Sequence, residues 1–286
     1  MPSRRPKLGQ HFLADPRFRQ RIVDALPLGH SELVVEIGPG RGAMTGLLVE
    51  RASRVVATEL DSALAETLRR EFHDETRLEV IGADILAVDV SRLCRERHVE
   101  TCFVFGNIPY YITSPILHRL FGFHASIHGM ALLMQREVAE RVIARPGRRE
   151  YGYLTILARA FSYPRLLLDV PPGAFSPTPQ VSSALVGFEM RSQPGGPLPA
   201  LLEARGIGVK KLNPGEVDRF LRFVQTCFAQ KRKRLLNNLG RTYGREAVEM
   251  QLDRLGLAVE TRAEELEVEV LADIFAGLKL RAGARD

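Results

Sequence analysis

Residues 33–42, which read Leu-Val-Val-Glu-Ile-Gly-Pro-Gly-Arg-Gly, decide the fold of this chain. The first five, Leu33–Ile37, are mostly apolar and β-branched, as in a buried strand. Three alternating glycines follow, and Met44–Arg51 then has a helical pattern of apolar residues. Because glycine has no Cβ, such a turn lets a ligand approach the backbone closely. The stretch therefore predicts a strand, a ligand-binding turn and a helix.

Short apolar runs and helical patterns continue to alternate up to about residue 134. After the second run, Leu60, Leu64 and Leu68 recur every four residues behind Asp61, which can cap a helix. This alternation is typical of a parallel sheet covered by helices, so we expect an α/β, Rossmann-like domain. The expected strands are Leu33–Ile37, Val55–Thr58, Leu78–Ile81, Cys102–Phe105 and Met130–Met134.

The later part of the chain has a different organisation. Runs at Arg165–Leu168 and Ala184–Phe188, on either side of the turn-rich stretch Val170–Val181, predict an antiparallel hairpin added to the sheet edge. Proline and glycine then gather in Arg191–Pro199, which predicts a linker. Beyond the linker, apolar residues at helical spacing predict a small all-helical domain. The expected domains are residues 1–190 and 198–286.

The residues around the glycine turn favour S-adenosylmethionine over a dinucleotide as the ligand. The pattern is GxGxG rather than GxGxxG, with Gly38 and Gly40 as the closest contacts, and the acidic Glu36 precedes it. Glu59 ends the second strand, where a carboxylate can accept hydrogen bonds from both ribose hydroxyls. Asp84 ends the third strand and could accept the adenine amine of the cofactor, although a turn or N-cap aspartate fits it equally well.

The segment after the fourth strand, Asn107-Ile108-Pro109-Tyr110, predicts the chemistry. The exocyclic amine of adenine is a poor nucleophile because its lone pair is delocalised into the ring. Two acceptors aimed at the amine protons, the Asn107 side-chain oxygen and the Ile108 carbonyl, would localise that pair. Pro109 would fix the turn and Tyr110 would stack on the base. Such a transfer is an in-line displacement that depends on positioning and needs no metal.

Taken together, these motifs make the sequence resemble the KsgA-type ribosomal RNA adenine dimethyltransferases, relatives of the erythromycin-resistance methylases and the mitochondrial transcription factor B proteins. The resemblance covers nearly the whole chain. The matching motifs are Lys7–Leu13, Glu36–Gly42, Glu59–Asp61, Asp84, Asn107–Tyr110 and Val170–Pro177.

The resemblance implies roles for individual residues. Asn107 and Tyr110 would handle the target base, with Phe175 on its other face. His11 stands where many members have Asn, an exchange that a backbone contact would survive. The cofactor contacts that the resemblance implies are at His11, Leu13, Gly38, Glu59, Asp84 and Asn107.

Charge is distributed unevenly along a chain of net charge +6 and pI near 9.5. Residues 205–245 hold eleven Lys and Arg against two acids, whereas residues 246–286 hold five against ten. The densest run contains Lys231, Arg232, Lys233 and Arg234, and we expect it to contact RNA phosphates. On a helix these four side chains cannot all face one way, so two or three contacts are expected.

The cysteines and the distribution of apolar residues limit which class of protein this chain can be. Cys94, Cys102 and Cys227 lack the spacing of a metal or disulfide framework, so we expect buried thiols and no metal. No signal peptide or apolar stretch of membrane-spanning length is found, and we expect a soluble, cytoplasmic monomer that contacts no membrane.

The sequence thus predicts an enzyme that dimethylates, by resemblance, two adjacent adenines in the terminal hairpin of small-subunit ribosomal RNA during assembly. A large-subunit methylase of the resistance type is the nearest alternative, although Phe228–Asn238 looks more like the small-subunit group. An assembly or transcription factor that keeps the fold without catalysis is the alternative from another class. Asn107, Tyr110 and Glu59 argue against it, because RNA binding alone requires none of them.

Overall fold

The computed structural model describes residues 11–29, 32–191, 216–230 and 232–282. The chain divides into two compact units. Unit 1 holds Met1–Ala139 and Pro164–Met190, and unit 2 holds Glu140–Tyr163 and Arg191–Asp286. Unit 2 therefore takes residues 140–163 in addition to the C-terminal segment, which differs from the expected boundary at residue 190.

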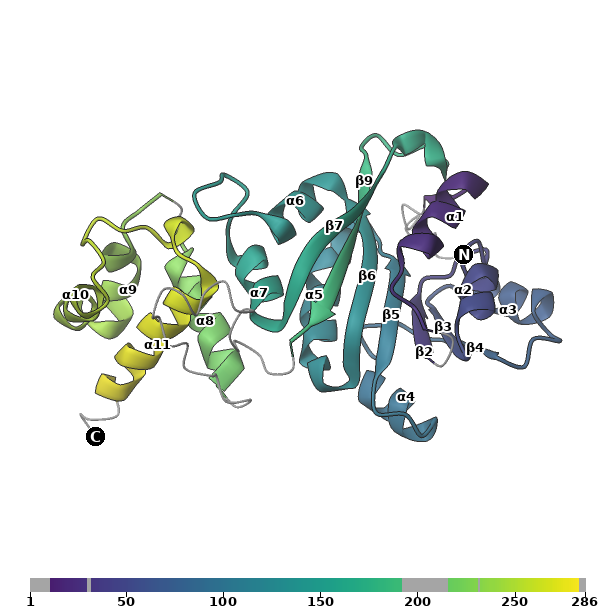
Figure 1. The fold of residues 1–286 in the computed structure, drawn as a ribbon, viewed down its shortest axis with the longest axis horizontal. Helices are drawn as coiled ribbons and strands as arrows, with labels where there is room; N and C mark the ends of the chain where they lie inside the picture. Colours follow the sequence, from purple (N-terminus) through teal and green to yellow (C-terminus); the bar gives the residue numbers. More distant parts are fainter. Residues whose placement is uncertain (1–10, 30–31, 192–215, 231, 283–286) are drawn as a thin grey trace, which may run out of the picture. The chain divides into compact units, whose positions relative to one another are not determined.

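The centre of unit 1 is a seven-stranded sheet of order β4-β3-β2-β5-β6-β9-β7 (Figure 1). From β4 to β6 all neighbours are parallel, and β9 joins β6 antiparallel. The five predicted parallel strands are confirmed. The predicted hairpin at the sheet edge is also confirmed, and β7 is its outer strand. The strands are β2 (Leu33–Ile37), β3 (Arg54–Glu59), β4 (Leu78–Gly82), β5 (Cys102–Asn107), β6 (Ile127–Gln135), β7 (Ser162–Val170) and β9 (Ser183–Met190).

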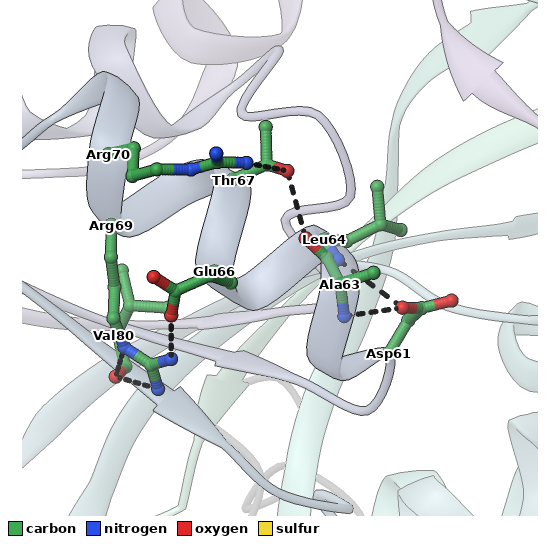
Figure 2. Close-up of polar contacts among 8 residues, drawn as sticks. All are labelled: Asp61, Ala63, Leu64, Glu66, Thr67, Arg69, Arg70 and Val80. Atoms are coloured by element: carbon green, nitrogen blue, oxygen red, sulfur yellow. Dashed lines mark hydrogen bonds and ion pairs between the residues drawn. The ribbon is translucent and has the colours of Figure 1, made fainter.

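Helices connect the parallel strands, and α3 begins at the capping residue that the sequence suggests. Asp61 accepts hydrogen bonds from the backbone N–H groups of Ala63 and Leu64, which fixes the start of α3 (Figure 2). Arg69 on the same helix donates to the Val80 carbonyl of β4 at 3.0 Å, so α3 is tied to the sheet edge (Figure 2). The helices up to residue 143 are α1 (Pro16–Ala25), α2 (Thr45–Arg51), α3 (Ser62–Glu71), α4 (Val90–Glu96), α5 (Thr113–Gly122) and α6 (Arg136–Ile143).

A second, two-stranded sheet joins segments that are far apart in the sequence. β1 (Phe12–Leu13) pairs antiparallel with β8 (Phe175–Ser176), so that Phe12 lies opposite Ser176 and Leu13 opposite Phe175. Leu13 and Phe175 are only 4% and 3% exposed, and both join the apolar core of unit 1. The sequence did not predict this sheet.

Unit 2 is built from helices around an aromatic core. Phe223 lies 5.5 Å from Phe275 and 5.8 Å from Tyr243 between ring centroids. The Tyr151 hydroxyl donates to the Leu266 carbonyl at 2.6 Å, which explains why residues 140–163 belong to this unit. The predicted helical character is confirmed. The helices are α7 (Tyr153–Phe161), α8 (Val217–Cys227), α9 (Leu235–Tyr243), α10 (Arg245–Arg254) and α11 (Val268–Ala282).

Two further findings concern the described residues alone. None of their helices combines the length and apolar character needed to cross a bilayer. The three cysteines are buried free thiols, as expected.

Candidate active site

A cavity opens in unit 1 at the carboxyl ends of the parallel strands. The chain runs outward from β2 to β3 and β4, then returns to place β5 on the other side of β2. Ligands of open α/β sheets bind at such a reversal of strand order. Most of the predicted cofactor residues line it: His11, Gly38, Gly40, Glu59, Asp84 and Asn107.

The glycine turn forms one wall of the cavity. Gly38, Gly40 and Gly42 have φ values of +63°, +58° and +75°, a region that L residues with side chains rarely adopt. A Cβ on Gly40 would come within 2.7 Å of the Phe12 ring, which also lines the cavity. The alternating glycines thus permit both the turn itself and the close approach of the N-terminal segment.

Glu59 connects this turn to the next helix. Its carboxylate accepts one hydrogen bond from the Gly40 N–H at 2.9 Å and another from the Asp61 N–H at 2.9 Å. The side chain is only 3% exposed but reaches the cavity wall. A carboxylate has about four lone-pair sites, so two remain for a ligand.

Asp84 makes a local turn and also lines the cavity. Its Oδ1 accepts a hydrogen bond from the Leu86 N–H at 2.9 Å, as in an Asx turn. The half-buried residue also lines the cavity between Ala83 and Ile85.

Glu36, the acidic residue ahead of the glycines, does not line the cavity. Its buried carboxyl accepts a hydrogen bond from the Thr45 hydroxyl at 2.8 Å. Burial raises the pKa of Glu36 to about 8; the Thr45 hydrogen bond opposes the shift and the nearby Glu59 charge adds to it. Glu36 is therefore predominantly protonated at neutral pH and links β2 to the start of α2.

Asn107 lies at the end of β5 with its side chain held in a fixed orientation. Its Nδ2 donates to the His11 carbonyl at 3.1 Å, which leaves Oδ1 as the acceptor end of the amide. The next residue, Ile108, is anchored by its N–H to the Leu133 carbonyl of β6 at 3.1 Å. Pro109 has φ −59° and starts the 3-10 turn Tyr110–Ile112. The side chain of Tyr110 lies outside the described part of the chain.

The N-terminal residues form the part of the cavity wall next to the glycine turn. The carbonyl of His11 contacts Asn107, and its ring Nδ1 is hydrogen-bonded to the Pro177 carbonyl at 2.7 Å. Leu13 and Phe175, in contrast, do not line the cavity and pack in the core behind it. The resemblance implied that Phe175 contacts the target base. The structure instead buries this side chain in the core, away from the cavity surface.

Phe12 and Tyr111 are among the cavity residues to which the sequence assigned no role. The Phe12 ring lies against Gly40 of the glycine turn. The guanidinium of Arg41 is 4.9 Å from the centroid of the same ring. Tyr111 follows the predicted Asn107–Tyr110 motif directly and is the most exposed of the large apolar side chains described. The sequence signals were that Phe12 lies within the Lys7–Leu13 motif and that Tyr111 directly follows Asn107–Tyr110.

The basic run is located in unit 2, between α8 and α9. The expectation that it is helical is wrong, because α9 begins only at Leu235. Asn238 donates to the carbonyls of Cys227 and Gln230, and the Lys233 N–H donates to the Gln230 carbonyl as in a turn. Lys231 lies outside the described residues. The three described basic residues of this turn are exposed: Arg232, with φ +67°, Lys233 and Arg234.

Metal ligands do not cluster in the part of the chain that the structure describes. No group of three or more His, Cys, Asp or Glu side chains there could hold an ion.

Comparison with known proteins places this geometry in one family. The ribosomal RNA adenine dimethylase family matches residues 1–200. The small-subunit ribosomal RNA methyltransferase A of Acidobacterium capsulatum is 42% identical over 97% of this chain and 92% of its own length. The enzyme of the same name from Geobacillus thermodenitrificans is 34% identical over 96% and 91%.

Solved structures agree with the fold along most of the chain. The 23S rRNA methyltransferase ErmE is 27% identical and superposes with a TM-score of 0.70 over 94% of this chain and 99% of its own. A dimethyladenosine transferase from Plasmodium falciparum, 21% identical, gives a TM-score of 0.74 over 95% and 98% and supports the fold. The chain is a member of the ribosomal RNA adenine dimethylase family.

Proposed function

We propose that this protein transfers methyl groups from S-adenosylmethionine to the N6 amines of two adjacent adenines in small-subunit ribosomal RNA. The single observation that carries the proposal is the Asn107 amide, which is held by the His11 carbonyl at the edge of the cavity. It acts, we propose, as a monomer on an assembly intermediate of the small subunit in the cytoplasm.

The cavity residues fit S-adenosylmethionine. Glu59 has lone pairs left for ribose hydroxyls, Asp84 offers a carboxylate, and Gly38 opens the turn to a ligand because nothing but the Asn107 carbonyl comes within 4 Å of a Cβ placed there. His11 and Gly40 would complete the contacts. When bound, the cofactor would supply an electrophilic methyl group on a sulfonium.

Asn107 and Ile108 would prepare the target amine. Their two oxygens can accept the two amine protons and draw the lone pair of the nitrogen out of the ring. This arrangement needs no strong base, because the protein contributes position and charge dispersal. Tyr110 would stack on the base. Phe175 would contribute from the core, where it holds β1 and hence His11 against Asn107.

RNA would be bound in part by the basic turn of unit 2. Arg232 and Lys233 are exposed, and Arg234 lies 3.6 Å from Glu260. Exposed Lys and Arg side chains supply phosphate contacts without reading sequence.

The identities favour small-subunit RNA over the large-subunit alternative. Two relatives named for the small subunit are 42% and 34% identical to this chain, against 27% for the 23S enzyme ErmE. A factor without catalysis would not require the oriented Asn107.

The test is methylation of unmethylated ribosomal subunits by the purified protein. With S-adenosylmethionine and small subunits, mass spectrometry of the RNA should find dimethyladenosine at two adjacent positions, whereas Asn107→Ala should give almost none. Large subunits serve as the matched substrate control. Methylation of large subunits instead would support the resistance-type alternative, and no methylation of either would refute the proposed function.

A further inference from the structure

Two exposed apolar side chains lie at the mouth of the cavity. Tyr111 is 61% exposed and Leu60 is 53% exposed, and both line the cavity. The four other exposed large apolar side chains among the described residues are 40–45% exposed, and none lines it. Single exposed apolar residues are common, but the two most exposed of these side chains both line the cavity that is proposed to bind the substrates.

The two residues lie on opposite sides of β2. Leu60 follows Glu59 at the end of β3, on the side that fits the cofactor. Tyr111 belongs to the 3-10 turn after β5 and thus lies on the side of Asn107. The strands β3 and β5 are separated by one strand, or about 10 Å. Tyr111 therefore lies on the Asn107 side of the cavity, away from Glu59.

An extruded target base leaves its neighbour without a stacking partner. A tyrosine ring can replace that partner, since stacking of a base on an aromatic side chain contributes about 1–3 kcal/mol and tolerates any base. The exposed ring of Tyr111, close to the residue that would receive the target amine, has the chemistry to do so. Because tyrosine has only two side-chain torsions, fixing the orientation of its ring costs little conformational entropy.

We propose that Tyr111 is a substrate-recognition residue that stacks on the nucleotide next to the target adenine. This inference rests on the proposed function and extends it. It assigns Tyr111 to RNA affinity, while Asn107 acts on the amine itself.

The experiment measures steady-state methylation of an RNA hairpin by the full-length protein and its Tyr111→Ala and Tyr111→Phe variants. We expect Tyr111→Ala to raise the KM for RNA about 5- to 150-fold, the factor equivalent to the loss of one stacked base, with kcat and cofactor affinity unchanged. Tyr111→Phe should keep the parent KM. Val181→Ala, which removes an exposed apolar side chain outside the cavity, is the matched control.

A second substrate makes the test specific for stacking. Hairpins with an abasic site on the 5′ or the 3′ side of the target adenine should raise the KM of the parent, and for one of them Tyr111→Ala should cause no further increase. Independent, multiplying effects on both hairpins would overturn the proposal, as would an unchanged KM for Tyr111→Ala or an equal loss of cofactor affinity. If the parent itself methylates no RNA, the proposed function fails first and this inference with it.

Discussion

The cavity of unit 1 and the basic turn of unit 2 hold their functional groups in opposite ways. In the cavity, Glu59 is 3% exposed and bonded to two backbone N–H groups, and Asn107 is held by the His11 carbonyl. In the turn, Arg232 and Lys233 are exposed on the surface. Preorganised groups act through geometry, whereas exposed charges act through the local potential. Substitutions should therefore have large, specific effects in the cavity and graded, salt-dependent effects in the turn.

The strongest test of this contrast is Gly38→Val. The substitution puts a branched side chain at φ +63° on the cavity wall, and we expect cofactor binding to be lost in calorimetry. Gly147→Val is the matched control, because Gly147 also has a positive φ, of +80°, but nothing lies within 4 Å of its Cβ position. Tight binding by Gly38→Val would show that the turn does not contact the cofactor.

Asn107→Ala should have the next largest effect. Removing one preorganised transition-state contact typically costs 10²–10³ in kcat, and we expect a loss of about that size. Asn107→Asp sharpens the test, since it keeps an acceptor but places an oxygen against the His11 carbonyl in place of the donor. Single-turnover rates should be low for both variants. A parent-like rate for Asn107→Ala would mean that the residue only supports the fold.

The buried Glu36 predicts a pH dependence of stability. Its folded pKa of about 8 lies above the ordinary value of 4.5, so the folded state binds the extra proton. This contribution is fully present below pH 4.5 and is lost as the pH rises toward 8. Between pH 6 and 8 the free energy of unfolding should fall by about 2 kcal/mol more in the parent than in Glu36→Gln. Urea titrations at both pH values measure the difference, and equal falls would contradict it.

The smallest effect is expected in the basic turn. A double variant, Arg232→Gln with Lys233→Gln, should lower the slope of log affinity against log salt by about 0.7–0.9 for each phosphate that the turn no longer neutralises. Cofactor binding should stay at the parent value. The double change of Arg92 and Arg95 to Gln, on exposed positions of α4, is the control with equal charge removed. If both double variants changed the slope equally, the turn would be an ordinary charged surface.

Local patterns were sufficient to predict the sheet and much of the cavity. The strand Leu33–Ile37 matches β2 residue for residue, and Asp61 caps α3 as expected. Both are determined by neighbouring residues: hydrophobic runs between turns, and a short side chain that can bond nearby N–H groups. Gly38, Glu59 and Asn107 come together because parallel strands end at one edge of the sheet.

What could not be predicted depends on distant residues. The burial of Phe175 follows from the pairing of β8 with β1, two residues long on each side and invisible to periodicity. Arg232, Lys233 and Arg234 lie outside any helix, and the Lys233 N–H donates to the Gln230 carbonyl, whereas the composition of the run is compatible with a helix. Residues 140–163 belong to unit 2 through contacts such as Tyr151 with Leu266.

The pairing of β1 with β8 has a consequence for the order in which the site is assembled during synthesis. β1 lies at residues 12–13, but its partner is at residues 175–176, so the two strands can pair only after most of unit 1 has been made. Closing so long a loop costs entropy that local elements such as α3 avoid. A nascent chain that ends before Phe175 would carry the glycine turn, Glu59 and Asn107, but its N-terminal segment would lack the strand that holds His11 in place. The active site is thus completed late, when the last strands of unit 1 are available.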